Sequence, residues 1–461
     1  MKLKPIYFLA ILIGIYSCKE TQKTELTLNG TWNSIGYGQQ IHIDDSKLEI
    51  YDVYENGCSF NTQLPKNYLN EYFEVINLVQ DSLTLRLGFT NYDFVRPNSE
   101  TSFCEQKNLS TNDPLKNFDA LWYTFNENYP SFKLRNVDWQ ESKERYRPRL
   151  NSQSTDLELF NVLEEMTSEL NDGHVSLDIP ESLEDKIEDD EDEFDHTRES
   201  VINAINNKYV DSLKTYNNGI INWGIIKDSI GYIQINDFED LANYDIDQNA
   251  SEENFWDAYW ENADNSENYP KDVLNGIREI MKTIFNDVEN TKSCIIDVRF
   301  NGGGFDQAGL EVLSYFTSIK IVAFTKKARY GNDFTKTQSI YLEPNEQTYS
   351  GNLYILTSYQ TASASETFVL ASQSLENAET IGSNTEGILS DVLSKKLPNG
   401  WEYGLSNEIY LGKEKINYEK VGISPNYDLD YPKSGVEFYN LLLDELKIDD
   451  RAIEKVIELN E

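Results

Sequence analysis

Hydrophobic and polar positions alternate over the first hundred residues of this chain. From Leu28 to Asn98 the alternation is clearest in three segments: 40–43, 48–51 and 83–87. A period of two, interrupted by glycine and asparagine, is typical of half-buried antiparallel strands. We therefore predict a small antiparallel β domain over residues 24–110.

The period becomes helical in the next segment. Apolar side chains recur at steps of three and one between Phe118 and Phe125, which places them on one helix face. Thr155 followed by Glu158 matches a capping box in front of a second apolar stripe. These patterns predict a helical bundle over residues 114–172.

Beyond Asp228, short apolar runs alternate with an amphipathic stretch at 273–288. Three runs have the length and composition of buried strands: 231–235, 294–298 and 353–357. Strands separated by helices require crossover connections and form a layered α/β core. We predict this core over residues 173–432 and C-terminal helices over 433–461.

Charge narrows the possible partners. The 461 residues carry 79 acids against 40 Lys and Arg, a formal net charge of -39. Such a surface repels phosphate backbones, so we expect no nucleic-acid partner. Residues 181–195 hold ten acids in fifteen positions, which is typical of a solvated loop. Calcium binding there would require glycine-punctuated alternating acids, which are missing. With three histidines and no closely spaced cysteine pair, we expect no metal and no cofactor.

The N-terminus has the pattern of a targeting segment. Lys2 and Lys4 precede the apolar stretch 6–15, which is too short to span a bilayer, and Tyr16-Ser17-Cys18 follows it. This ending resembles a bacterial lipobox. We predict a signal peptide over residues 1–18, lipid on Cys18 and an exported lipoprotein at the outer membrane, on its periplasmic or surface face. The alternative is a plain secretory signal with an incidental cysteine.

The other cysteines fit an exported protein. Cys58 and Cys104 both lie in the N-terminal third and are predicted to form a disulfide. Cys294 lies in an apolar run, and we expect it to be a buried small apolar residue.

Ser363 follows a predicted buried strand and precedes a predicted helix. A serine at the start of a helix lies near unpaired backbone N–H groups, which stabilise developing negative charge during acyl transfer. The alternative is purely structural, because Ser363 and Glu366 also match a capping box.

A glycine-rich turn supplies candidate partners for the nucleophile. Asp297 to Gly304 ends in three glycines, whose backbone can approach a ligand closely. We assign the oxyanion hole to the N–H groups of Gly302, Gly303 and Ala364, although a tight strand-to-helix turn would have the same composition.

His174 is the candidate general base because its pKa lies near neutrality and it lies in a turn leading into a strand. A purely structural histidine is the alternative. Glu419 is the candidate carboxylate that completes a triad.

These segments together resemble one family, the carboxyl-terminal processing proteases, which includes the tricorn core protease and retinoid-binding-protein repeats. The matching blocks occur in the family's order: Leu170-Asn-Asp-Gly-His174, Gly231-Tyr-Ile-Gln-Ile235, Ile296-Asp-Val-Arg-Phe-Asn-Gly-Gly-Gly304, Ser363-Ala-Ser-Glu366 and Glu419-Lys-Val-Gly-Ile-Ser-Pro425. The resemblance implies a crotonase-like layered α/β core behind a helical bundle, with Ser363 and not Ser365 as nucleophile. Gly30-Thr31-Trp32 also resembles the start of lipocalin-like modules.

Two departures from the family pattern select a branch. The processing proteases use a lysine base, but Ile388 occupies that position, and Lys395 and Lys396 lie beyond it. The tricorn-like branch uses a histidine, and His174 matches its position. In that branch a serine precedes the histidine, whereas in this chain the preceding residue is Gly173. The resemblance therefore implies His174 as base and leaves the role of Glu419 indirect. Between Leu177 and Gly231 there are too few residues, many of them acidic, for the PDZ domain that many members of the family carry.

We therefore expect a lipid-anchored serine peptidase that acts on proteins or peptides through an acyl-enzyme on Ser363. The alternative is a non-catalytic ligand- or peptide-binding lipoprotein on the same fold.

Overall fold

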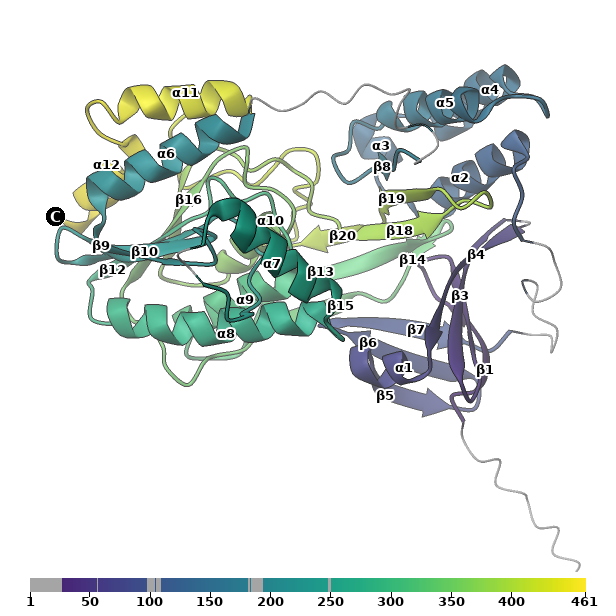
Figure 1. The fold of residues 1–461 in the computed structure, drawn as a ribbon, viewed down its shortest axis with the longest axis horizontal. Coiled ribbons are helices and arrows are strands. Elements are labelled where there is room, and N and C mark those ends of the chain that lie inside the picture. The colour runs from purple at the N-terminus through teal and green to yellow at the C-terminus, as the bar shows by residue number, and fades with distance from the viewer. Residues whose placement is uncertain are drawn as a thin grey trace, which may run out of the picture.

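The computed structural model describes residues 27–55, 57–97, 104, 109–180, 183, 194–247 and 250–461. The predicted signal peptide, Cys18 and most of the acidic run lie outside these residues. Figure 1 shows an N-terminal sheet beside a layered core, with a separate group of helices above that sheet. No helix within the described ranges is long and apolar enough to cross a membrane.

The predicted N-terminal β domain is a seven-stranded antiparallel sheet in the order β4-β3-β2-β1-β7-β6-β5. Its elements are β1 (Gly30–Ser34), β2 (Gln39–Ile43), β3 (Lys47–Tyr54), β4 (Gly57–Pro65), α1 (Asn67–Tyr72), β5 (Glu74–Val79), β6 (Ser82–Leu87) and β7 (Thr90–Val95). Alternate residues such as Leu83 and Leu85 are buried with Trp32, as the period of two predicted.

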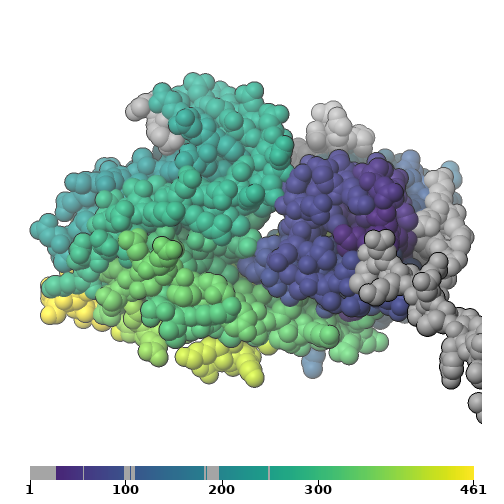
Figure 2. Space-filling model, turned by 90° about the horizontal axis from the view of Figure 1, so that it is seen from below, coloured from purple at the N-terminus to yellow at the C-terminus, as the bar shows by residue number. Residues whose placement is uncertain are grey.

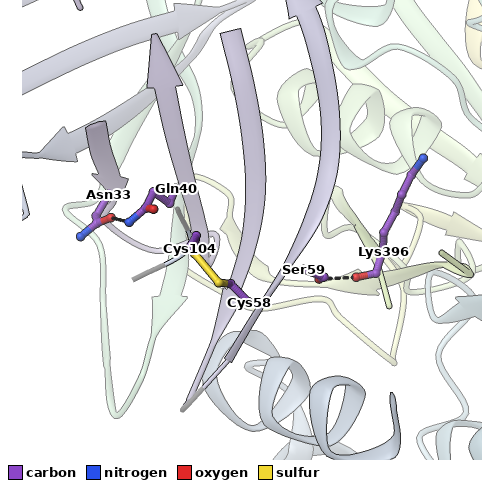
Figure 3. The surroundings of a disulfide bond; sticks show 6 residues. All are labelled: Asn33, Gln40, Cys58, Ser59, Cys104 and Lys396. Atoms are coloured by element: carbon purple, nitrogen blue, oxygen red, sulfur yellow. Dashed lines mark hydrogen bonds between the residues drawn. A yellow bond between two sulfur atoms is a disulfide. The ribbon is translucent and has the colours of Figure 1, made fainter. Parts of the chain in front are cut away.

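The predicted disulfide is present. Cys58 at the start of β4 is bonded to Cys104, with the two Cα atoms 6.0 Å apart (Figure 3). The bond closes a separation of 46 residues, which in the chain-entropy model is worth about 3–4 kcal/mol. Beside it, the Ser59 hydroxyl donates to the Lys396 carbonyl at 2.8 Å, so the same strand also contacts the core.

Helices occupy the segment in which a helical bundle was predicted. Its elements are α2 (Pro114–Asn128), α3 (Phe132–Arg135), α4 (Trp139–Tyr146), η1 (Arg147–Arg149) and α5 (Asp156–Ser168). The capping box of Thr155 and Glu158 is formed at the start of α5. Phe118 and Phe125 are fully buried on the apolar face of α2.

The core is a seven-stranded sheet in the order β21-β17-β16-β12-β11-β10-β9. Its strands are β9 (Asp211–Tyr216), β10 (Ile221–Ile226), β11 (Ile230–Ile235), β12 (Ser293–Asp297), β16 (Asn352–Thr357), β17 (Ala378–Gly382) and β21 (Tyr427–Asp428). From β11 to β21 neighbouring strands are parallel, so the carboxyl ends of β11, β12 and β16 meet at one edge.

Helices cover both faces of this sheet (Figure 1). One face packs against α7 (Glu252–Asp264), α8 (Tyr269–Val288), α9 (Asp306–Leu313) and α10 (Ala364–Ser372). The other packs against α6 (Phe194–Tyr209), α11 (Gly435–Glu445) and α12 (Arg451–Asn460). Within β12, Ile296 faces the first layer and Ile295 the second, so the run is apolar throughout. The expected layered α/β fold is confirmed.

Two smaller sheets join the core to the other parts. The first has four strands: β13 (Ile321–Tyr330), β14 (Asp333–Phe334), β15 (Gln338–Leu342) and β20 (Glu408–Leu411). The short 3-10 helix η3 (Ser314–Phe316) precedes β13 in the chain. The other contains β8 (Ser176–Leu177), β18 (Val392–Lys396) and β19 (Glu402–Ser406). The strand β8 follows the helical bundle in sequence and pairs with β19 of the core. The exact boundary at residue 172 between bundle and core stays a prediction.

A buried lysine connects the β domain to the core. The Nζ of Lys395 on β18 lies 2.9 Å from Asp52 Oδ1 and donates to the carbonyls of Tyr37 and Gly38, both at 2.7 Å. Burial lowers the pKa of Lys395, while Asp52 acts in the opposite direction. The Tyr37 hydroxyl in turn donates to Glu408 Oε1 at 2.7 Å, inside the core. The interface between the β domain and the core therefore contains buried charged groups, each stabilised by a partner from the other part.

We predict that Lys395→Met destabilises the protein by about 3–5 kcal/mol, because it leaves the buried Asp52 carboxylate without its cation. Lys396→Met is the matched control: Lys396 is partly exposed and pairs with Glu402 at 2.8 Å, so its loss should cost less than about 1 kcal/mol. Urea unfolding of the two variants measures the difference. Equal losses would contradict a structural role for Lys395.

Candidate active site

Ser363 lies at a sharp turn between β16 and α10. Its backbone has φ 52° and ψ -122°, a strained conformation for a residue with a side chain. The Ser363 hydroxyl makes no capping hydrogen bond to α10. The capping-box interpretation is therefore wrong for this helix, and the hydroxyl is available to another partner.

Glu366 explains why no capping box forms. Its side chain is fully buried and accepts hydrogen bonds from the Thr385 hydroxyl at 2.5 Å and from the amides of Gly387 and Ile388 at 2.8 and 2.7 Å. Burial raises the pKa of Glu366 to about 8, and these three donors oppose that effect. The carboxylate thereby fixes the loop beside Ser363 instead of the helix start.

The partner of Ser363 is His174, 189 positions away in the chain. His174 Nε2 lies 3.0 Å from Ser363 Oγ, within hydrogen-bond distance. Burial is the main cause that lowers the pKa of His174, while Asp172 and the Ser390 backbone raise it. A neutral imidazole in this position can accept the hydroxyl proton.

Asp172 positions the histidine through the backbone. Its Oδ1 accepts the His174 amide at 3.1 Å and the Ser406 hydroxyl at 3.2 Å. Its Oδ2 accepts the Tyr129 hydroxyl at 2.7 Å. Among the described residues no side-chain carboxylate bonds the His174 ring, and the backbone of Ser390 interacts with it instead, so backbone segments and not a carboxylate hold the ring.

Arg135 is the residue of this site that sequence reasoning missed. Its Nε lies 3.2 Å from Asp172 Oδ2, and its Nη2 donates to Glu419 Oε1 at 2.6 Å. Its Nη1 also donates to the Asn171 carbonyl. All three charged side chains are almost completely buried. Among 40 Lys and Arg, no local pattern marks Arg135, because its partners are distant in sequence.

Glu419 contacts the site indirectly. Apart from Arg135, it accepts the Leu389 amide at 3.0 Å, and no hydrogen bond joins it to His174 among the described residues. Burial and the nearby Asp172 raise the pKa of Glu419 to about 7, whereas Arg135 lowers it. Glu419 therefore fixes the segment around Leu389. Its predicted role stays indirect and not that of a carboxylate bonded to His174.

The glycine turn lies directly against Ser363. Gly303 has φ 132°, and a Cβ built on it would lie 2.7 Å from the Cβ of Ser363, so only glycine fits. The Gly303 amide donates to Asn301 Oδ1 at 2.9 Å and is therefore engaged. The amides of Gly302 and Ala364 have no acceptor in the part of the chain that is described. Of the three predicted oxyanion donors, these two are the available ones.

The lysines considered as alternative bases lie in ion pairs. Lys395 pairs with Asp52 of the β domain and Lys396 with Glu402. Ile388 lies beside the histidine loop, since its Cδ1 is 3.2 Å from a Cβ built on Gly173. His42 contacts the Thr31 hydroxyl in the β domain, and the side chain of His196 lies outside the described residues.

No group of three or more His, Cys, Asp or Glu in the described ranges could hold a metal ion.

Two regions of the chain match models of known protein families. Residues 229–429 match the model of peptidase family S41, and residues 110–168 match the tricorn protease C1 domain. A candidate peptidase from Parabacteroides merdae has a similar structure, with 25% identity, a TM-score of 0.55 and an alignment covering 76% of this chain and 97% of that one.

Two further structures are similar at lower identity. Mature CPAF is 10% identical with a TM-score of 0.49, over 73% of this chain and 96% of that one. The photosystem II D1 C-terminal processing protease is 13% identical with a TM-score of 0.43, over 72% of this chain and 97% of that one.

The matched regions contain most of the site. The family model spans Ser363, the glycine turn and Glu419, and the C1-domain match covers the helices that carry Arg135. His174 lies between the two matches. With its peptidase core and its tricorn-type helices in the family's order, the chain belongs to peptidase family S41.

Proposed function

We propose that the protein is a serine-type peptidase that cleaves peptide bonds through an acyl-enzyme on Ser363, with His174 as general base. The observation that carries this proposal is the 3.0 Å separation of His174 Nε2 and Ser363 Oγ. The strained turn at Ser363 supports it, because backbone strain is concentrated at functional sites.

The first half-reaction follows from these two side chains. His174 Nε2 takes the proton of the Ser363 hydroxyl as Oγ attacks the substrate carbonyl carbon. When the tetrahedral intermediate collapses, the C–N bond breaks and His174 returns the proton to the leaving amine. A water molecule then attacks the ester carbonyl while His174 takes one of its protons. As the ester C–O bond breaks, His174 returns that proton to Ser363 Oγ, and the carboxylate product leaves.

The amides of Gly302 and Ala364 are the proposed oxyanion donors. Ala364 is the first residue of α10, where the N–H groups point away from the helix and the positive end of its dipole favours an anion. Gly303 does not donate to the oxyanion in this proposal, because its amide already donates to Asn301. Its carbonyl accepts the Phe238 amide at 2.8 Å, and these two bonds hold the glycine turn close to Ser363.

Arg135 and Glu419 act in this proposal as positioning residues. The guanidinium links the loop before His174 to the segment at Glu419, whose other oxygen holds Leu389. Neither touches the reacting atoms, so their effect on rate comes through the placement of His174.

The proposal includes export and lipid attachment at Cys18. The support is the sequence of residues 1–18, with its positive start, apolar stretch and terminal cysteine. Acyl chains on Cys18 would hold an acidic protein at a membrane surface.

We predict that Ser363→Ala and His174→Ala each lower kcat/KM on an unstructured peptide or casein about a thousandfold or more, as triad deletions do. Lys396→Ala is the control and should stay within a few-fold of wild type. A fluorophosphonate should label Ser363 selectively in the wild-type protein. No labelling and no turnover would instead indicate a binding protein on this fold.

The pH dependence of kcat/KM distinguishes the base. The imidazole must be neutral to accept a proton, so activity should fall as the pH drops through the pKa of His174. Burial lowers that pKa from its ordinary 6.5, so the acid limb should have its midpoint below 6.5. A midpoint above 6.5 would contradict a histidine base whose pKa is lowered by burial.

Cys18→Ala should move the protein from the membrane fraction to the soluble fraction, because the lipid chains are the proposed anchor. Fractionation of cells that express each form measures this. Retention of the variant in the membrane fraction would refute the anchor.

A further inference from the structure

A cavity of about 320 Å³ opens at Ser363, and the N-terminal domain forms part of its wall. The core contributes the start of α9 at 304–307 and the segment 389–392. The β domain contributes residues 87–90 and Tyr92, the turn between β6 and β7. The N-terminal β domain therefore reaches the cavity of the proposed nucleophile.

A second cavity, of about 290 Å³, lies between the concave side of the β domain and β18. Its lining is mostly apolar, with Ile41, Leu48, Ile50, Leu69, Leu85 and Phe94 from the β domain. The two cavities share four lining residues: Leu87, Tyr92, Asp391 and Val392. They are therefore adjoining spaces with a common wall.

Two apolar side chains of the common wall are exposed. Leu87 is 38% and Val392 41% accessible, although each lies between two cavities. Apolar residues exposed at the mouth of a concave, largely apolar cavity are typical of a ligand-binding site. Their position next to the Ser363 cavity indicates that the ligand is the substrate itself.

The β domain is held in place on both sides of these cavities. On one side, the Gln338 amide bonds the backbone N–H and carbonyl of Asn91, both at 2.8 Å. On the other, Asn268 Nδ2 donates to the Glu71 carbonyl at 2.9 Å and the Tyr72 hydroxyl to the Glu267 carbonyl at 2.7 Å. Figure 2 shows a hollow between the β domain and the core. Because these hydrogen bonds fix the two parts relative to each other, the cavities between them are preformed.

The charge of the common wall favours some substrates over others. Asp391 lines both cavities, and Asp306 lines the Ser363 cavity. The nearby cation, Lys326, is already paired with Glu408 at 2.8 Å. An acidic substrate side chain would be repelled here.

We propose that the N-terminal β domain is a substrate-recognition module, whose apolar cavity takes a large apolar side chain of the peptide held at Ser363. The inference rests on the proposed peptidase function for the identity of its ligand. Leu87 and Val392 contact the apolar side chain as it passes the common wall, and Asp391 disfavours peptides with an acid at that position.

The experiment compares two sets of unstructured peptides that differ only in one residue, Leu or Ser, scanned through the positions around the cleaved bond. We expect one position at which Leu raises kcat/KM about ten- to a hundredfold over Ser, from burial of the side chain. In Leu87→Ser and in Val392→Ser this preference should fall to about twofold or less. Ile448→Ser is the matched control, since Ile448 is exposed between α11 and α12, and it should keep the preference.

Binding measured without turnover separates this inference from the peptidase proposal. Fluorescence anisotropy of labelled peptides on the Ser363→Ala protein should show the same preference for Leu and the same loss of preference with Leu87→Ser. If the preference is present but the wild-type protein cleaves nothing, the peptidase proposal fails and the recognition module stands. If no position prefers Leu, or if Leu87→Ser and Val392→Ser keep the preference, the inference is wrong.

Discussion

The geometry of the site depends on the ion pairs of the buried Arg135 guanidinium. The guanidinium holds Asp172, two residues before His174, and Glu419, whose second oxygen fixes the Leu389 amide. Three segments far apart in the sequence therefore meet at one cation. Such a cluster is stable only as a whole, because loss of the cation would leave two carboxylates buried together. The position of the imidazole ring is a consequence of this arrangement.

The same physical principle operates at the domain interface. Lys395 holds Asp52 and two backbone carbonyls of the β domain, and Tyr37 extends to Glu408. In the lysine-dependent branch of the family a nearby lysine is the base, whereas here Lys395 is used to dock a domain. That docking brings the β6–β7 turn to the Ser363 cavity, so the structural role of the lysine and the shape of the cleft are connected.

Close packing at the turn completes the site. Ser363 has a positive φ, and Gly303 lies so near that no side chain fits between them. Glu366 anchors the neighbouring loop by accepting hydrogen bonds from the amides of Gly387 and Ile388. The strained turn at the serine is therefore held by close packing against Gly303 and by the hydrogen bonds of buried Glu366, which keep the hydroxyl beside His174.

The sequence by itself determined the elements whose burial follows a local period, such as β2, β6, α2, α8 and β12, and it singled out Ser363 and His174. The disulfide also followed from two cysteines in one predicted domain. The tertiary structure alone decided that Arg135 belongs to the site, that the Gly303 amide is occupied and that the β domain walls the cleft. Periodicity reports which side of a local element is buried, whereas these features depend on contacts between side chains or backbone atoms placed by the packing of whole elements.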